Sequence, residues 1–194
     1  MSTPICAHCS KPFTRRYSTL QAVCSPKCAQ AKVNADKRAK KAAQIAERKV
    51  DKAKLDAMKR LPVLIDEAQR EVNRYVRLRD ERRYGRVCIS CGSKPTNKPG
   101  GTLDAGHFRS RGSAPQLRFY LPQIALQCVR CNRDRGGERD GFKAGLSLRL
   151  GAERVAAIEI MSGPANVDRD YLLRMKRVMA KKANREKKRL ESMK

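Results

Sequence analysis

Eight cysteines and two histidines carry most of the chemistry that this sequence offers. Four of the cysteines form two CxxC pairs, Cys88 with Cys91 and Cys128 with Cys131, separated by a long insertion. Two thiolates spaced in this way can hold one Zn²⁺ from a tight turn, and two such turns complete a tetrahedron. We therefore expect a structural zinc site, because four cysteine ligands leave no open coordination position.

A second group of cysteines near the N-terminus has less regular spacing. Cys6 and Cys9 form a CxxC pair, and Cys24 and Cys28 follow as CxxxC. We expect a second structural zinc here. His8 lies inside the first turn and could compete as a ligand, but with four cysteines present we expect a surface residue. Each structural zinc contributes roughly 10–16 kcal/mol, which can fold a module whose core is too small to fold alone.

The second histidine, His107, follows a glycine in the segment LDAGHF, between the Cys88–Cys91 pair and the Cys128–Cys131 pair. A four-cysteine site with a long insertion can staple a β-hairpin to a following helix, and Asn132 would lie near the start of that helix. Asp104 and His107 would lie on a strand or its turn. A carboxylate, a carboxamide and an imidazole could then converge on one divalent cation.

These residue types suit phosphodiester hydrolysis. Oxygen ligands from Asp104 and Asn132 fit Mg²⁺ or Mn²⁺, which would offset charge on the phosphorus and on the leaving oxygen. Neutral His107, with an ordinary pKa of roughly 6.5, could take a proton from the attacking water. The alternative is a loop histidine with no catalytic role.

The charge of the chain points to a polyanionic partner. Lys and Arg number 45 against 19 Asp and Glu, which gives a formal charge of +26. Such a charge opposes compaction, so nucleic acid is the first candidate partner and an anionic membrane surface the second. Six arginines flank the candidate site and are candidate contacts to DNA phosphates. They are Arg109, Arg111, Arg118, Arg130, Arg133 and Arg135.

No stretch approaches the roughly 20 apolar residues that a membrane span needs. The N-terminal residues MSTPICAHCSK lack the hydrophobic core of a signal peptide. Eight cysteines would suit disulfides in a secreted chain, but close pairs in a reducing compartment indicate metal ligands. We therefore expect a cytoplasmic protein that is not secreted.

Glycine, proline and cysteine content divides the chain into four parts. Residues 1–29 form the N-terminal zinc module, and residues 30–84 form a glycine-free helical arm broken at Pro62. Residues 85–141 are rich in loops, with short β-like runs such as LRFYL, and form the zinc-stapled core. Residues 142–194 return to helix, with two short helices split at a glycine and a basic helix over about residues 167–191.

Two helical stretches are strongly basic. Residues 30–61 and residues 166–194 each carry eleven Lys or Arg against four acidic residues. We expect both to follow phosphates rather than read bases, with structure-selective binding and a steep salt dependence. Residues 30–61 have only a thin stripe of alanines and could be exposed or lie on a charged partner. Residues 63–84 carry a proper amphipathic stripe, which could pack on its own module or form a homodimer interface.

Three motifs, DAGHFRSRGSAPQLRF, QCVRCN and FKAGLSLRLG, carry a family resemblance. They resemble the zinc-stapled form of the HNH (ββα-metal) nucleases and, more closely, the lambda-type NinG, or Rap, phage recombination nucleases. The resemblance covers about residues 63–165. It implies an α+β fold in which a small zinc-stabilised ββα-metal core (HNH- or treble-clef-like) carries long basic helical extensions and a separate N-terminal zinc knuckle.

The resemblance also implies a function. It indicates an endonuclease, dependent on Mg²⁺ or Mn²⁺, that acts on branched recombination intermediates such as D-loops and Holliday junctions. By position, His107 would be the general base, and Asp104 and Asn132 would be metal ligands. Symmetric cutting of a branch would need a homodimer.

Two positions depart from the HNH pattern. The position before the catalytic histidine, usually a metal ligand, is Gly106, and Asp104 on the same strand face could replace that ligand. The middle asparagine is absent, and Gln123 could hold the loop by equivalent amide hydrogen bonds. These departures keep open a non-catalytic zinc-knuckle protein that binds or anneals nucleic acid. A basic zinc protein associated with RNA or the ribosome is a third interpretation.

Overall fold

The structure is a computed structural model that describes residues 3–95 and 102–193. The chain divides into two compact units, Met1–Lys59 and Arg60–Lys194. The fold is α+β, mostly helical with one small sheet, as expected. Three of the four expected parts contain residues that lie outside the described residues, namely 1–2, 96–101 and 194. No helix in the described part of the chain is both long and apolar enough to cross a membrane.

The first unit is a small cysteine-rich knuckle followed by α1 (Pro26–Met58). The N-cap residue Ser25 accepts a hydrogen bond from the Cys28 backbone N–H at 3.3 Å, and Pro26 begins the helix with a preset φ. Helix α1 buries none of its 33 residues within the unit. The thin alanine stripe is therefore not buried within this unit. That α1 lies on a charged partner stays a prediction.

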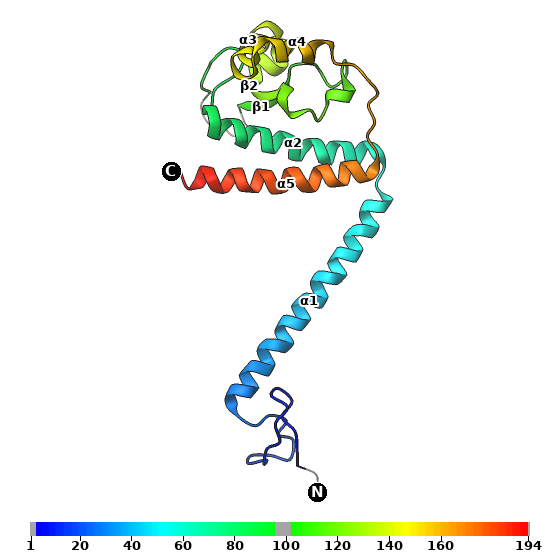
Figure 1. Cartoon of the computed structure of the whole chain (residues 1–194), viewed down its shortest axis with the longest axis vertical. Coiled ribbons are helices and arrows are strands. Elements are labelled where there is room, and N and C mark those ends of the chain that lie inside the picture. Colours follow the sequence, from blue (N-terminus) through cyan, green and yellow to red (C-terminus); the bar gives the residue numbers. More distant parts are fainter. Residues whose placement is uncertain (1–2, 96–101, 194) are drawn as a thin grey trace. The chain divides into compact units, whose positions relative to one another are not determined.

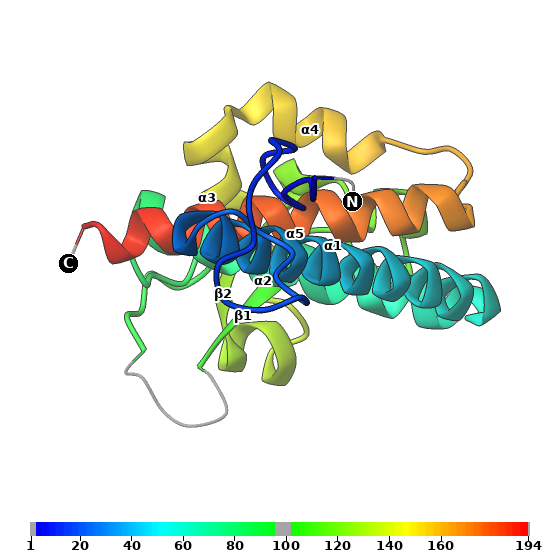
Figure 2. The same cartoon turned by 90° about the horizontal axis from the view of Figure 1, so that it is seen from below.

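The second unit is built on two parallel helices, α2 (Leu61–Tyr84) and α5 (Arg169–Glu191), which lie side by side in both views (Figure 1, Figure 2). Lys176 of α5 donates to Glu67 of α2 at 2.7 Å, and Arg82 near the end of α2 pairs with Glu186 near the end of α5. The amphipathic stripe of α2 is buried in this unit, so packing on its own module is the alternative that the fold adopts. The members of the stripe are Leu64, Ala68, Val72 and Val76.

A two-stranded antiparallel sheet lies against α2. Strand β1 (Leu103–His107) pairs with β2 (Ile124–Cys128), with Ala105 opposite Leu126 and Gly106 opposite Ala125. Because successive side chains alternate between faces, Ala105 faces the α2 core, whereas Ala125 packs in a second core with Phe142 and Leu146.

The expected β-like run LRFYL is not a strand. It connects two 3-10 turns, η1 (Pro115–Leu117) and η2 (Leu121–Gln123). Pro115 and Pro122 explain this outcome, because proline fixes φ and has no N–H for a sheet ladder. The apolar residues Leu117 and Phe119 are buried as loop anchors instead, and the strand begins at Ile124.

Helices α3 (Arg139–Leu150) and α4 (Ala152–Ile160) form the expected pair, split at Gly151, whose φ is +88°. Two further glycines, Gly141 and Gly145, let α3 lie against the turn that holds Cys88 and Cys91. A Cβ atom at Gly145 would collide with the Ile89 carbonyl oxygen, and one at Gly141 with the Ser90 carbonyl oxygen. The backbone of α3 therefore supports the cysteine turn directly.

Candidate functional site

Both cysteine groups are assembled as the sequence predicts. Within each group the four Sγ atoms lie within 4.8 Å of one another, and all eight cysteines are free thiols. A tetrahedral zinc with Zn–S bonds of about 2.3 Å would separate its sulfurs by about 3.8 Å. The Sγ atoms of Cys91 and Cys128 are 3.8 Å apart, and those of Cys9 and Cys24 are 3.7 Å apart. Both groups could therefore hold zinc.

The surroundings of the sulfurs also suit a bound cation. The backbone N–H of Cys131 donates to the Cys128 sulfur at 3.4 Å, as zinc-binding turns require. A hydrogen bond with Ser93 lowers the pKa of the Cys91 thiol to about 6, whereas burial raises the pKa of the Cys131 thiol. Four thiolates at this spacing need a cation to balance their charge. His8 is exposed and lies outside the N-terminal group, as expected.

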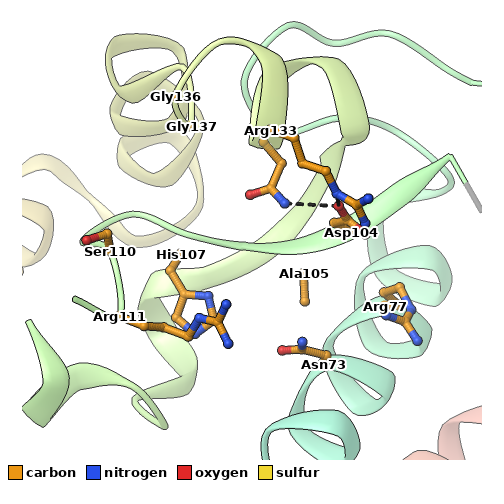
Figure 3. Close-up of a pocket in the computed structure, with 11 residues that line it drawn as sticks. Asn73, Arg77, Asp104, Ala105, His107, Ser110, Arg111, Arg133, Gly136 and Gly137 are labelled. Atoms are coloured by element: carbon orange, nitrogen blue, oxygen red, sulfur yellow. Dashed lines mark hydrogen bonds and ion pairs between the residues drawn. The ribbon is translucent and has the colours of Figure 1, made fainter. Parts of the chain in front are cut away.

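A depression of about 530 Å³ lies across β1 (Figure 3). It brings together the three residues that the sequence singles out, Asp104, His107 and Asn132. Strand β1, helix α2, the loop after β1, and η3 (Arg130–Asp134) with the glycines that follow it supply the lining. The depression is basic, because Arg77, Arg111 and Arg133 line it, whereas Asp104 is the one carboxylate among the described residues of its lining.

Asp104 and Asn132 are in direct contact. The Asn132 side-chain amide donates to Oδ2 of Asp104 at 3.0 Å. Arg133 donates two hydrogen bonds to the same carboxylate, from Nε at 2.8 Å and from Nη2 at 3.1 Å. The turn of η3 therefore directs two consecutive side chains, Asn132 and Arg133, back onto β1, and both donate N–H groups to the Asp104 carboxylate.

His107 lies on the opposite face of the strand. Asp104 and His107 are three residues apart, and an odd spacing places two strand residues on opposite faces. In Figure 3, His107 and Ala105 point to the side of Asn73 and Arg77 on α2, whereas Asp104 meets Arg133 on the other side. The three residues line one depression, but His107 does not converge with the other two on one point.

The donor set is small for a divalent cation. Apart from the cysteine groups, residues 3–95 and 102–193 contain no cluster of three or more His, Cys, Asp or Glu that could hold a metal. Asp104 and Asn132 fit Mg²⁺ or Mn²⁺ in oxygen chemistry, and water and substrate phosphate would have to complete the coordination.

His107 is held as a neutral ring. Burial, together with the positive charges of Arg111 and Arg118, lowers the pKa of His107 to about 4. Its Nε2 lies 3.1 Å from the Arg118 carbonyl oxygen, and because a carbonyl only accepts, Nε2 carries the proton. The lone pair of the neutral ring therefore lies on Nδ1.

This pKa predicts a measurable pH dependence of stability. Between pH 6.5 and 4 the unfolded chain binds a proton at His107 that the folded chain does not, so the free energy of unfolding decreases as the pH falls through this window. Between pH 6.5 and 5 the loss should be about 1.5 kcal/mol larger for the wild type than for His107→Gln. Urea unfolding at both pH values measures it. An NMR titration of His107 with a midpoint near 6.5 would contradict the prediction.

Packing explains why a glycine precedes His107. A Cβ atom at Gly106 would collide with the side chain of Gln127, which is fully buried beneath it. The amide of Gln127 donates to the Ser90 hydroxyl at 2.8 Å and to the Gly137 carbonyl at 2.6 Å. Gln127 therefore occupies the space that a side chain at position 106 would need, and it ties the Cys88–Cys91 turn to the rim of the depression.

Gln123 performs the loop-holding role proposed for it. Its side-chain oxygen accepts from the Arg109 backbone N–H at 2.8 Å, and its amide donates to the Leu117 carbonyl at 2.8 Å. Gln123 is fully buried, so these two bonds satisfy groups that would otherwise be costly to bury. They fix the loop that follows His107.

The six arginines predicted to contact DNA have different surroundings. Arg111 and Arg133 line the depression, and Arg130 is exposed outside its lining. Arg109 donates to the Met161 carbonyl at 2.6 Å and so ties the end of α4 to the loop after β1. The remaining two are Arg118, which is partly buried, and Arg135, which pairs with Glu138 at 3.4 Å.

Sequence reasoning missed the contribution of α2 to this site. Asn73 and Arg77 line the depression from that helix. The available signal was their spacing: they are four residues apart and therefore share one helix face, each next to a buried valine of the stripe.

The chain matches the family model described as Bacteriophage Lambda NinG protein over residues 2–191. It belongs to the NinG family. The chain is 40% identical over 95 residues to Protein ninG of Escherichia phage lambda and 39% identical over 95 residues to Protein ninG of Salmonella phage P22. Each match covers 49% of this NinG chain and 43% of the relative, so less than half of the relative's length is matched. No solved structure matches the chain.

Proposed function

We propose that this NinG protein is a divalent-metal-dependent, structure-selective endonuclease of the zinc-stapled HNH type, and that it hydrolyses phosphodiesters in D-loops and Holliday junctions. The observation that carries the proposal is the contact between Asp104 and Asn132, two residues far apart in sequence, beside a neutral histidine in a basic depression. The likeness of the motifs to Rap-type nucleases supports the same reaction class.

The shape of the site favours cutting within a strand rather than from an end. A second depression, of about 390 Å³, shares His107, Ser110, Gly136 and Gly137 with the first. The two hollows therefore meet at His107 and could accept a strand that continues on both sides. Nothing lies within 4 Å of the positions where Cβ atoms would stand at Gly136 and Gly137, so backbone can approach a phosphate there.

The residues of the chain divide the chemical work. Nδ1 of His107 accepts a proton from the attacking water, and the Arg118 carbonyl fixes the ring by accepting from Nε2. Arg77 and Arg111 bind the phosphate oxygens. Asp104 and Asn132 would hold a divalent cation, which when bound offsets charge on the phosphorus and on the leaving oxygen. Because His107 and Asp104 lie on opposite faces of β1, the phosphodiester would lie across the edge of that strand.

One observation favours a second candidate function. Arg133 neutralises Asp104 through two hydrogen bonds, and Gly106 removes the usual ligand position. A NinG protein that keeps this ion pair would bind or anneal branched DNA through its zinc knuckles and basic helices without cutting it. In both cases we propose branched DNA as the partner. For symmetric cutting we propose a homodimer, whose interface would lie outside the buried stripe of α2.

Cleavage of a labelled four-way junction tests the proposal. Wild type should nick the junction with Mg²⁺ or Mn²⁺ and cut linear duplex far less. His107→Gln should lose roughly 10²–10⁴-fold in rate while binding persists. The matched control is His8→Gln, which changes the exposed histidine and should cut normally. The metal-free control reactions should leave out Mg²⁺ and Mn²⁺ without a chelator, because a chelator would also remove zinc. Binding by all variants with cleavage by none would favour the second function.

A further inference from the structure

The loop between the two cysteine pairs of the N-terminal group exposes large apolar side chains. Tyr17 is 84% exposed and Leu20 is 88% exposed. Both lie in the segment RRYSTLQ, which begins with Arg15 and Arg16. Single exposed apolar residues are common on protein surfaces, but an aromatic ring and a leucine next to two arginines match the composition of surfaces that bind nucleic acid.

This loop has a defined conformation built around Gln21. The Gln21 side-chain oxygen accepts from the backbone N–H groups of Arg16 at 2.9 Å and Tyr17 at 3.3 Å, and its amide donates to the Val23 carbonyl at 2.9 Å. Arg15 donates back to the Gln21 carbonyl at 3.2 Å. One side chain therefore closes the turn and connects it to Val23, the residue before Cys24, so that Tyr17 and Leu20 are held outward at little entropic cost on binding.

The charge around the loop specifies the chemistry of the partner. Residues 1–35 contain no Asp or Glu, and Asp36 is the first acidic residue of the chain. Residues 1–59 contain 14 Lys or Arg against four Asp or Glu, a difference of +10. Helix α1 continues this charge from Pro26 onward as an exposed rod. The positive charge and exposed apolar side chains of this unit fit a polyanionic partner that also offers apolar surface for stacking.

We propose that the Tyr17–Leu20 tip binds DNA where a base is unstacked, as at a branch or a gap. The Tyr17 ring stacks on the unpaired base, Leu20 wedges against the neighbouring step, and Arg15 and Arg16 contact the flanking phosphates. This inference rests on the proposed function for its choice of DNA, but it concerns a binding site separate from the depression at His107. An anionic membrane would satisfy the charge, yet two apolar side chains provide little area for insertion.

Equilibrium binding without added Mg²⁺ or Mn²⁺ tests this site independently of cleavage. The probes are a gapped duplex carrying 2-aminopurine at the unpaired position and an intact duplex of the same sequence. Tyr17→Ala should bind the gapped duplex on the order of 10-fold more weakly, with its affinity for the intact duplex unchanged, and should not quench the 2-aminopurine as wild type does. Tyr17→Phe should retain the preference, because it keeps the ring.

Two controls make the result decisive. Leu148→Ala changes a leucine of α3 that is 90% exposed, and it should leave both affinities unchanged. Zinc content and circular dichroism of each variant establish that the N-terminal group is intact. If Tyr17→Ala keeps the wild-type preference for the gapped duplex, the inference is wrong. If it loses binding only to phosphatidylserine vesicles, the tip is a membrane contact. Because no step requires cutting, a protein that never nicks DNA could still show the Tyr17 effect.

Discussion

The variant Cys131→Ser should bind one zinc per chain instead of two and should lose the protected amides of β1 and β2. Cys131 belongs to a cluster of five buried residues, which also contains Cys88 and Cys128. We expect the zinc to be the largest single contribution to the stability of the sheet, because the roughly 10–16 kcal/mol from a structural zinc matches or exceeds the total stability of an ordinary domain. Hydrogen exchange resolved along the chain measures the loss over residues 86–137.

Cys9→Ser provides the matched control. It removes a ligand of the N-terminal group, so it should also reduce the zinc content to one per chain. The exchange protection of β1, β2, α2 and α5 should then remain as in wild type, since residues 60–194 form a separate compact unit. Protected β1 and β2 amides in Cys131→Ser, after verified loss of one zinc, would show that the group formed by Cys88, Cys91, Cys128 and Cys131 does not hold the sheet.

Asp80→Ala should lower the free energy of unfolding by about 3–5 kcal/mol. Asp80 is fully buried near the end of α2 and accepts from Arg79 at 2.6 Å and from Arg149 of α3 at 2.9 Å. Its Oδ2 also accepts from the Leu126 backbone N–H at 2.8 Å. One carboxylate therefore joins α2, β2 and α3, and its removal leaves two arginines without their counter-charge in a buried position. Urea unfolding followed by circular dichroism measures the change.

Glu81→Ala is the control for this prediction. Glu81 is the next residue on α2 and pairs with Arg86 at 3.2 Å, but both side chains remain partly exposed to water. A pair of this kind contributes less than about 1 kcal/mol. Equal destabilisation by the two substitutions would mean that Asp80 acts only through general charge and not through its buried contacts.

The helices were predictable because their causes are local. A glycine-free run of strong helix formers gives α1 and α2, Pro62 marks the break between them, and Gly151 separates α3 from α4. The run LRFYL was misread because residue type favoured a strand, whereas the neighbouring prolines prevented a ladder.

The site was predictable only where spacing carries the geometry. Two residues between paired cysteines fix a turn, so both cysteine groups were correctly read from the chain. Asn132 follows such a turn directly, which explains why its approach to Asp104 could be anticipated. The face occupied by His107 follows from strand alternation once the bounds of β1 are known, and the sequence did not show whether His107 lies on the strand or in its turn.

By itself, the sequence determined the two cysteine groups that could hold zinc, the helical stretches, the positive charge and the family of this protein. The tertiary structure alone showed that the Gln127 side chain leaves no room for a Cβ atom at Gly106. It alone showed that Arg133 pairs with Asp104, and that α2 supplies Asn73 and Arg77 to the depression. The physical reason is the range of the interactions. Propensity and ligand spacing act within a few residues, whereas these contacts depend on how elements distant in sequence pack against each other.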